Sequence, residues 1–287
     1  MRVSVVICTR DRADSLGRCL SYIQEIEFED AWHLVIIDNG STDHTREVVE
    51  TARAEGRIEI DYVYEALPGL ARARNAARPF VKGDLIFFTD DDCYVAPDIL
   101  TALEAAFEDP QTGFVSGRIM LFDPTDYPAT INESTDCVVF EANSFIRAGA
   151  VKGASLGFRT EVLEDIDWFD PLFGAGAHFA SEDCDAAGRA SLANWRGRYV
   201  PEMVVHHHHG RKASDIGGLL KAYAIGRGAY HTKLFYVPGG KRASLKGWVG
   251  ALRRSIRRPS NLFWELRGGF GYLRKRGLPD GAGIRAT

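Results

Sequence analysis

The chain has 287 residues, 45% of them hydrophobic, and a net charge of −4 at pH 7. This length and apolar content suffice for a sizeable core, which excludes a disordered protein and fits one large domain with or without a small appendage. The five cysteines are scattered and lack Cys-x-x-Cys spacing, so we expect reduced core thiols rather than disulfides or a zinc-cysteine site.

The first residues enter an apolar run directly, without the basic region and cleavage site of a secretory signal. The sequence also lacks a run of about 18 apolar residues, which a transmembrane helix would require. We therefore expect a protein of the cytoplasm or of the inner face of the cell membrane.

Charge is unevenly distributed along the chain. Residues 1–210 hold 18 Lys and Arg against 36 Asp and Glu, a net charge of −18, whereas residues 211–287 hold 17 against 3, a net charge of +14. An acidic body is thus followed by a basic segment.

In residues 2–121, short β-branched runs alternate with helical stretches, which predicts a mostly parallel sheet covered by helices. The predicted strands are 3–8, 33–38, 58–64, 85–89 and 113–121. Two helix starts are readable, because Ser41, Thr42 and Asp43 offer N-cap oxygens and Pro97 suits a first helical turn. Ligands of such sheets bind beyond the carboxyl ends of the strands.

The residues at those strand ends are polar. They are Thr9, Arg10 and Asp11 after the first strand, Asp38 to Ser41 after the second, and Asp90 to Asp92 after the fourth. The chain has no Gly-x-Gly-x-x-Gly after the first strand and no Gly-x-x-x-x-Gly-Lys-Ser/Thr, which argues against a dinucleotide dehydrogenase and a P-loop NTPase. A bound nucleotide would have to be held in another way.

Three consecutive carboxylates, Asp90, Asp91 and Asp92, repel one another and require a cation or hydrogen-bond donors nearby. Mg²⁺ and Mn²⁺ prefer oxygen ligands and are often shared between carboxylates and substrate phosphates. Asp90 and Asp92 are therefore candidate metal ligands. The alternative is a solvated acidic turn that caps the helix near Pro97.

Two further clusters lie far along the chain. In the segment Ser181 to Asp185, Asp183 is a candidate base for an acceptor hydroxyl and Glu182 a candidate for positioning that acceptor, although acids at a helix start are also common without a function. The histidines at 206–209 follow an apolar run, and one of them could complete a metal site. A solvated turn is the alternative, and the mid-chain position argues against a purification tag.

Together these residues resemble the family-2 glycosyltransferases of the GT-A fold, in motif order from Val3 to about Lys233. The resemblance is carried by VSVVICTRDR, VIIDNGSTD, GLARARNAARPFVKGDLIFFTDDD and KGASLGFRTEVLEDIDWFDPLFGAGAHFASEDCD. It implies an α/β GT-A fold with a mostly parallel central sheet and flanking helices. Its catalytic domain would comprise a nucleotide-sugar-binding half, 1–121, and an acceptor-binding half, 122–235, followed by a basic helical extension, 236–287.

The resemblance also implies the role of each site residue. Donor binding falls to Thr9, Arg10, Asp11, Asp38, one of Arg72 and Arg74, Asp90 and Asp91; metal binding to Asp90, Asp92 and His207, with His207 uncertain by one position; acceptor binding to Glu182, Gly153 and Ala154; and base catalysis to Asp183. The sequence departs from the family at Ala180-Ser181, where two glycines are frequent, and at Ser155, where Asn is frequent. These departures leave the acceptor undetermined.

The implied activity is inverting transfer of a sugar from a nucleotide-diphosphate donor, by default a UDP-sugar, with Mn²⁺ or Mg²⁺ as cofactor. The acceptor would be a glycan, a lipid-linked molecule or a cell-surface glycan precursor. A sugar nucleotidyltransferase is the first alternative, but its glycine-rich, Lys-bearing loop is absent from residues 8–15. A non-catalytic nucleotide-sugar-binding protein is the second, although it would need neither a base nor metal ligands.

The basic segment contains two amphipathic patterns. Trp248, Leu252 and Ile256 share one helical face near several arginines, and a second apolar set after Pro259 comprises Phe263, Trp264, Leu266, Phe270 and Leu273. Such helices commonly lie on anionic membrane surfaces. Packing on the acidic body or across a homodimer is the alternative. No nucleic-acid recognition motif accompanies the charge, so we expect no nucleic-acid partner.

Overall fold

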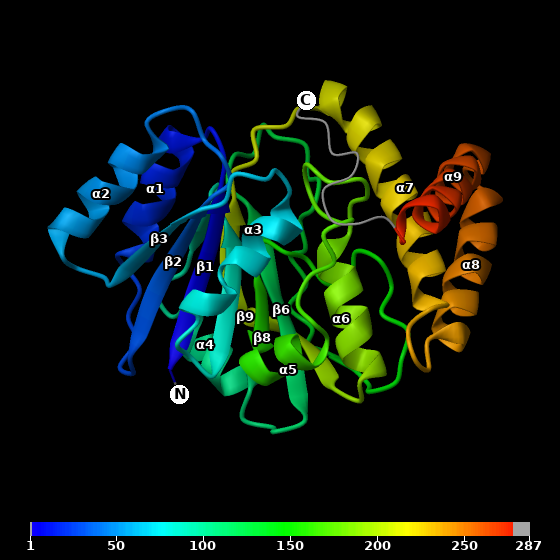
Figure 1. The fold of residues 1–287 in the computed structure, drawn as a ribbon, viewed down its shortest axis with the longest axis horizontal. Coiled ribbons are helices and arrows are strands. Elements are labelled where there is room, and N and C mark those ends of the chain that lie inside the picture. The colour runs from blue at the N-terminus through cyan, green and yellow to red at the C-terminus, as the bar shows by residue number, and fades with distance from the viewer. Residues whose placement is uncertain (1, 278–287) are drawn as a thin grey trace.

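The computed structural model describes residues 2–277 and shows one nine-stranded sheet with helices on both faces (Figure 1). The strands are β1 Val3–Thr9, β2 Trp32–Asp38, β3 Ile60–Tyr64, β4 Leu85–Asp90, β5 Cys93–Val95, β6 Thr112–Leu121, β7 Val138–Phe140, β8 Leu156–Arg159 and β9 Arg196–His207. The helices are α1 Ala13–Ile23, α2 Thr45–Glu55, α3 Leu70–Ala76, α4 Ile99–Ala106, α5 Thr160–Asp165, α6 Glu182–Leu192, α7 Ile216–Leu234, α8 Lys241–Ser255 and α9 Pro259–Lys275, with 3₁₀ turns at Arg78–Phe80 and Ala213–Asp215.

The strand order is β3-β2-β1-β4-β8-β6-β9-β5, with β7 paired to β9 outside this order. Strands β3, β2, β1 and β4 are mutually parallel, as the sequence predicts. Beyond β4 the sheet is mixed, because β8 runs antiparallel to both of its neighbours and β5 runs antiparallel to β9. The predicted α/β class is confirmed, and the mixed part adds the short strands β5, β7 and β8 that the sequence analysis did not identify.

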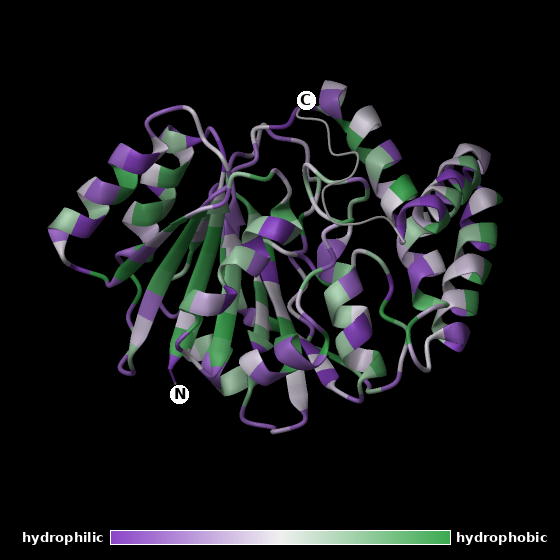
Figure 2. Ribbon diagram, in the orientation of Figure 1, coloured by the Kyte–Doolittle hydropathy of each residue, from purple (hydrophilic) through white to green (hydrophobic). Residues whose placement is uncertain are grey.

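Alternate side chains of the strands enter two separate cores. In β1, Val3, Val5 and Ile7 pack in a cluster with residues of α1, α2 and α4. Val6 points the other way, into a cluster with residues of α3, α5 and α6. Strands covered on both faces read as nearly continuous apolar runs, and Figure 2 shows them as hydrophobic arrows between mixed helices.

A few local expectations are refined or overturned. Asp43 supplies the N-terminal oxygen of α2, since its Oδ1 accepts a hydrogen bond from the Thr45 N–H at 3.1 Å. Pro97 lies before α4, which begins at Ile99 after an N-cap at Asp98, so its placement in the first turn is wrong. The expectation of core thiols fails for Cys137, which is exposed.

Within the basic segment, α8 and α9 form a helical layer on α7. Helices α8 and α9 both pack against α7 and against each other, at the edge of the molecule next to α6 (Figure 1). Buried Glu265 of α9 accepts hydrogen bonds from Arg227 at 2.9 Å and from Arg254 at 3.2 Å, which ties the three helices together. No described helix combines the length and hydropathy that a membrane crossing needs. The predicted boundaries at 121 and 235 stay a prediction, and residues 278–287 of the predicted tail lie outside the described residues.

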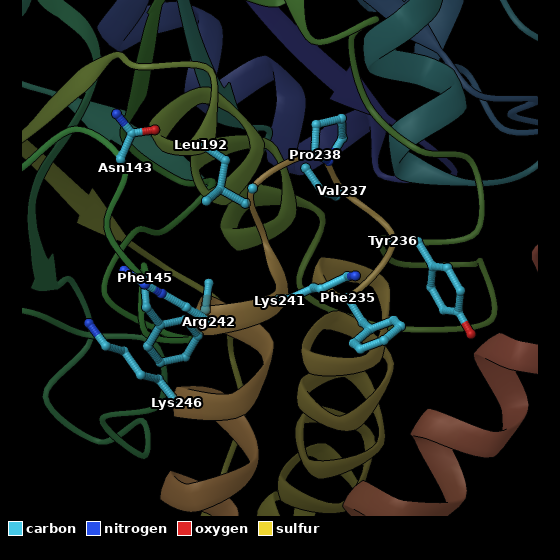
Figure 3. A pocket seen from close by; sticks show the side chains of 12 residues that line it. Asn143, Phe145, Leu192, Phe235, Tyr236, Val237, Pro238, Lys241, Arg242 and Lys246 are labelled. Carbon is cyan, nitrogen blue, oxygen red and sulfur yellow. The ribbon is translucent and has the colours of Figure 1, made fainter.

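A cavity of about 730 Å³ opens where α7 gives way to α8 (Figure 3). Phe145, Phe235 and Tyr236 contribute aromatic walls, and three cations of the first turns of α8, Lys241, Arg242 and Lys246, complete it. Figure 3 shows Arg242 and Lys246 together beside Phe145.

The contact between α7 and α9 depends on glycines. A Cβ at Gly228 would lie 1.7 Å from the Glu265 carbonyl oxygen, whereas a Cβ at Gly218 of the same helix would meet no atom within 4 Å. We expect Gly228→Ala to lower the free energy of unfolding by about 1–3 kcal/mol, because α9 must move outward. Gly218→Ala should instead stabilise by up to about 1 kcal/mol through helix propensity. Urea denaturation of both variants checks this, and equal effects would contradict the tight contact.

Candidate active site

The carboxyl ends of β1, β2 and β4 meet at one edge of the sheet. The strand register pairs Thr9 with Asp38 and Cys8 with Asp90. Residues that lie far apart in the sequence are therefore neighbours at the edge where α/β sheets bind ligands.

The three aspartates after β4 do not form a solvated turn. Asp91 and Asp92 are only 3% and 4% exposed, and the chain continues into β5 before any helix begins. The alternative of a solvated helix-capping turn is therefore wrong. Carboxylates buried in this way require compensating charges or hydrogen-bond donors.

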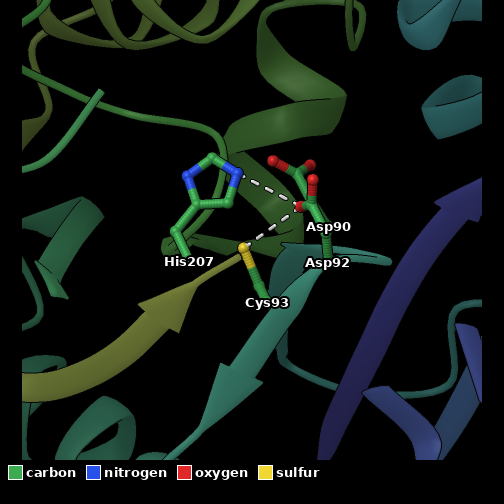
Figure 4. A group of neighbouring side chains, drawn as sticks. All are labelled: Asp90, Asp92, Cys93 and His207. Atoms are coloured by element: carbon green, nitrogen blue, oxygen red, sulfur yellow. Dashed lines mark hydrogen bonds and ion pairs between the residues drawn. The ribbon is translucent and has the colours of Figure 1, made fainter. Parts of the chain in front are cut away.

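Strand pairing brings His207 to these aspartates. Because β5 and β9 are antiparallel, Cys93 lies opposite His207, and ligand atoms of Asp90, Asp92, Cys93 and His207 all lie within 4.8 Å of one another. His207 Nε2 is 3.2 Å from Asp92 Oδ1, and its Nδ1 is 3.2 Å from the Thr130 hydroxyl. The ring is therefore held from both sides, and Figure 4 shows it turned toward the carboxylates.

This donor set fits a divalent cation such as Mn²⁺ or Mg²⁺. Carboxylate oxygens are the ligands that both ions prefer, and an imidazole also suits transition ions. Cys93 is the exception, because burial raises the pKa of its thiol well above the ordinary value and keeps the sulfur protonated. Asp90, Asp92 and His207, the three predicted ligands, are the residues that could hold the ion.

Burial and neighbouring charges make the three carboxylates unequal. Burial raises the pKa of Asp91 to about 7, against the opposing effects of Arg12 and the Thr9 hydroxyl. Burial also raises the pKa of Asp90, with Arg74 opposing it. Burial acts in the same direction on Asp92, but the hydrogen bond from His207 and the charge of Arg12 outweigh it and hold the pKa of Asp92 below its usual range. Asp92 is therefore the most firmly ionised of the three.

Arg12 is a site residue that the sequence reasoning missed. Its Nη1 lies 2.9 Å from Asp91 Oδ1 and its Nη2 lies 2.8 Å from Asp92 Oδ2. The Thr9 hydroxyl donates to the other oxygen of Asp91 at 2.7 Å. A planar guanidinium suits this two-pronged contact. The signal for it in the sequence is the charged run directly after the first strand, in which Arg10 and Asp11 are predicted to bind the donor and Arg12 is not.

Arg74 joins the aspartates to the acceptor-side residues. It is 2% exposed, with Nη1 3.2 Å from Glu182 Oε1 and Nη2 3.7 Å from Asp90 Oδ1. Its guanidinium also lies over the rings of Phe88 and Phe169 at 5.5 and 5.3 Å. Burial raises the pKa of Glu182 to about 7, with Asp183 adding to the effect and Arg74 opposing it.

The predicted base, Asp183, is half-buried in the first turn of α6. Its Oδ2 accepts a hydrogen bond from the Gly153 N–H at 3.0 Å, and its Oδ1 accepts one from the Cys184 N–H at 2.7 Å. The Gly153 carbonyl in turn accepts from Arg74 at 3.4 Å, and a Cβ at Gly153 would lie 2.6 Å from the same guanidinium nitrogen. A side chain at position 153 would therefore displace the Arg74 guanidinium, and Asp183 lies beside the pair formed by Arg74 and Asp90.

Several predicted donor-binding residues also hold the loops in place. Asp38 accepts hydrogen bonds from the Ser41 N–H at 2.7 Å and from the Tyr62 hydroxyl at 2.6 Å. Asp11 accepts from the Thr42 N–H at 2.7 Å, and exposed Arg10 lies 3.7 Å from Asp11. These contacts join the loops after β1 and β2 into one rim of the site.

Ala154 and the two predicted arginines differ in their hydrogen bonds. Ala154 is buried, and its carbonyl accepts a hydrogen bond from the Thr89 hydroxyl at 2.9 Å. Arg74 is committed to Glu182, whereas Arg72 Nε is buried without a hydrogen-bond partner in the described structure. Of the two predicted arginines, Arg72 is therefore the one whose Nε donor has no partner among the described residues.

The remaining histidines lie outside the cluster with Asp92. His206 is exposed, and His208 Nδ1 lies 3.0 Å from the Tyr94 hydroxyl. His209 is buried 3.7 Å from Asp126, which also pairs with Lys212 at 2.6 Å. Asp123, Asp126 and His208 form a second group whose ligand atoms lie within 4.8 Å of one another. Because Lys212 lies 2.6 Å from Asp126 and 3.8 Å from Asp123, this group resembles an ion-pair cluster more than a metal site.

The fold and the site together define a glycosyltransferase of the GT-A type. Residues 4–162, more than half of the chain, match the model of Glycosyl transferase family 2, and residues 85–264 match that of Glycosyl transferase family group 2. The chain belongs to glycosyl transferase family 2. The predicted family and the predicted GT-A fold are confirmed.

Individual relatives are distant. An uncharacterized glycosyltransferase, alr2836 from Nostoc sp., is 24% identical over 180 residues, which are 60% of this chain and 55% of that protein. The mannosyltransferase PcManGT from Pyrobaculum calidifontis, solved in complex with GDP-Man and Mn²⁺, has a TM-score of 0.65 at 18% identity and covers 95% of this chain and 87% of its own. S. aureus TarS 1-349 in complex with UDP-GlcNAc has a TM-score of 0.66 at 15% identity, covering 90% and 73%. These likenesses show the fold.

The candidate metal cluster can be tested by thermal shift. At a concentration of 100 times its Kd, a bound ion stabilises a folded protein by about 2.7 kcal/mol. We expect Mn²⁺ to raise the melting temperature and EDTA to reverse the effect, whereas Asp92→Asn and His207→Asn should each abolish most of the shift. Exposed His206→Asn, one position away, is the matched control and should keep it. A full shift in both cluster variants would rule out this site.

Proposed function

We propose that the chain is a metal-dependent, inverting hexosyltransferase that moves a sugar from a nucleotide-diphosphate donor to an acceptor hydroxyl. The observation that carries this proposal is the convergence of Asp90, Asp92 and His207 with Asp183, through Arg74, at the carboxyl ends of the strands. A UDP-sugar is our default donor, supported by the UDP-GlcNAc complex of TarS, and the GDP-Man complex of PcManGT makes a GDP-sugar the second choice. The Mn²⁺ of PcManGT supports manganese.

The residues at the strand ends divide the work on the donor. A divalent cation held by Asp90, Asp92 and His207 would offset the negative charge that develops on the departing nucleoside diphosphate. Arg72 can donate its unpaired Nε–H to a phosphate oxygen. The rim formed by Thr9, Arg10, Asp11 and Asp38 surrounds the nucleoside, and Arg12 keeps Asp91 and Asp92 in position.

Asp183 acts on the acceptor. Its carboxylate takes the proton of the acceptor hydroxyl while the acceptor oxygen forms a bond to the anomeric carbon. The bond between that carbon and the phosphate oxygen breaks, and its electron pair leaves with the nucleoside diphosphate. Attack from the face opposite the leaving group inverts the configuration in one displacement, without a covalent enzyme intermediate. Glu182, Gly153 and Ala154 line the acceptor side.

The acceptor we propose is a glycan or a lipid-linked precursor of a cell-surface glycan, used in the cytoplasm. Membership of family 2 argues against a sugar nucleotidyltransferase. A non-catalytic nucleotide-sugar-binding protein remains the second candidate, since binding alone would preserve the donor rim. It differs from the first in one measurable respect, because it has no use for a base at position 183.

Asp183→Asn tests the assigned base. We expect a loss of transfer by about 10²- to 10⁴-fold, because an amide cannot take the acceptor proton, with donor and Mn²⁺ thermal shifts preserved. Exposed Glu202→Gln serves as a control for removing one carboxylate and should retain full activity. The measurement is product formation from a panel of UDP- and GDP-sugars. Near-normal turnover in Asp183→Asn would remove the residue from this role.

The stereochemical course provides a separate test. Because one displacement inverts the anomeric carbon, an α-linked donor should give only a β-linked product at the earliest times. Proton NMR of the anomeric signal during turnover distinguishes the two configurations. A product of retained configuration would contradict the single displacement by an Asp183-activated hydroxyl even if the enzyme is active.

A further inference from the structure

The outer face of α8 carries an apolar stripe that no described part of the chain covers. Leu245, Val249, Leu252 and Ile256 are between 38% and 83% exposed. Their spacing places them on one side of a helix, and the small buried residues of α8 fall on the opposite side, toward α7. Trp248, which is predicted to share this face, belongs instead to the contact with α7, because its ring lies 5.8 Å from the buried ring of His231.

Helix α9 repeats the pattern. Phe263, Leu266, Phe270 and Leu273 are between 42% and 63% exposed and recur at helical spacing. The buried residues of this helix form a different face, which packs on α7: Glu265, Gly268, Gly269 and Tyr272. Both helices thus use small or polar residues to pack inward and leave their large apolar residues outside, the reverse of an ordinary surface helix.

The charge around the stripes is strongly positive. Residues 241–276 contain 11 Lys and Arg and one acid, Glu265, which is buried between Arg227 and Arg254. Arg253, Arg257 and Arg258 are exposed instead. A second copy of the chain docked by the same face would bring two such surfaces together, and like charges at close range repel. Charge complementarity therefore favours an anionic partner over a homodimer in which both copies use this face.

The cavity at the start of α8 is also lined by positive charge. Lys241, Arg242 and Lys246 line it, and none of its described lining residues is acidic. Arg242 and Lys246 both lie within one helical turn of Leu245 in α8, so cations accompany the first residue of the apolar stripe. An anionic headgroup at this level would meet positive charge while the stripe meets acyl chains.

We propose that the outer face of α8 and α9 docks on a bilayer surface that contains anionic lipids. The apolar stripes enter the boundary between headgroups and acyl chains, and the long Lys and Arg side chains reach back to lipid phosphates. A helix in this position lies in the plane of the interface and does not span the bilayer. Docking itself is independent of the chemistry at Asp183, and only its use for a lipid-linked acceptor rests on the proposed function.

Co-flotation of the full chain with vesicles tests the charge contribution. We expect binding to phosphatidylcholine vesicles that contain phosphatidylglycerol, with much weaker binding to pure phosphatidylcholine and a decline as salt rises. Arg257→Glu should lower the partition coefficient at least about fivefold, since each basic residue at the surface contributes about 1 kcal/mol. Arg57→Glu, an exposed arginine on the body, has the same charge change and should bind like the original protein.

The apolar contribution has its own matched pair. Leu252→Ser with Ile256→Ser should abolish most of the flotation, whereas Val138→Ser with Val139→Ser, which alters the exposed strand β7, should not. Absence of flotation on anionic vesicles in the original protein, or equal flotation of both pairs, overturns the proposal. So does sedimentation that shows a dimer split by the first pair. The donor thermal shift should be the same in all variants, so failure of docking and failure of the transferase proposal are separable.

Discussion

The site depends on one electrostatic constraint, which is the burial of negatively charged aspartates at the end of β4. Two like charges about 4 Å apart repel by roughly 4 kcal/mol at an effective dielectric constant of about 20, which is a large part of the net stability of a domain, about 5–15 kcal/mol. Asp91 and Asp92 are almost fully buried, so the fold must supply cations and donors. It does so with Arg12 from the β1 loop, Arg74 from α3 and His207 from the end of β9.

This compensation also distinguishes the three aspartates. Asp91 is satisfied within the protein, because Arg12 contacts one of its oxygens and Thr9 donates to the other. Asp90 is the least engaged, with its side chain 33% exposed and Arg74 no closer than 3.7 Å. Asp92 is held by His207 and Arg12 and stays ionised. Binding of a cation would thus add charge where compensation is incomplete, next to Asp90, without disturbing the bonds that fix Asp91.

The sequence predicts those parts of the protein in which the residue types alone indicate whether a segment is buried or binds a ligand. The apolar strands and the acids after β4 are of this kind, and with the resemblance they sufficed for the family, the fold and the candidate metal ligands. Arg12 was missed because its role depends on which loop faces β4, a tertiary fact. Strand β5 was missed because three residues give no period. The departure at Ser181 acquires meaning only from the structure, where this residue adopts a left-handed φ of 85° in which glycine is favoured.

The opposite charges of the body and the basic segment account for only part of how the segment packs. Buried Lys233 of α7 pairs with Asp170 at 2.8 Å and Asp185 at 2.7 Å, so one cation of the segment does bind the acidic body. Helices α8 and α9 instead pack on α7 through glycines and through Glu265, and Arg253 of α8 and Arg257 and Arg258 of the connection to α9 stay in solvent. Exposed charges more than about 8 Å apart are largely screened at physiological ionic strength, so these arginines contribute little to holding the helices on the acidic body. The outer face of the helices thus keeps positive charge beside large apolar side chains. This combination is the basis of the proposed docking on a bilayer that contains anionic lipids.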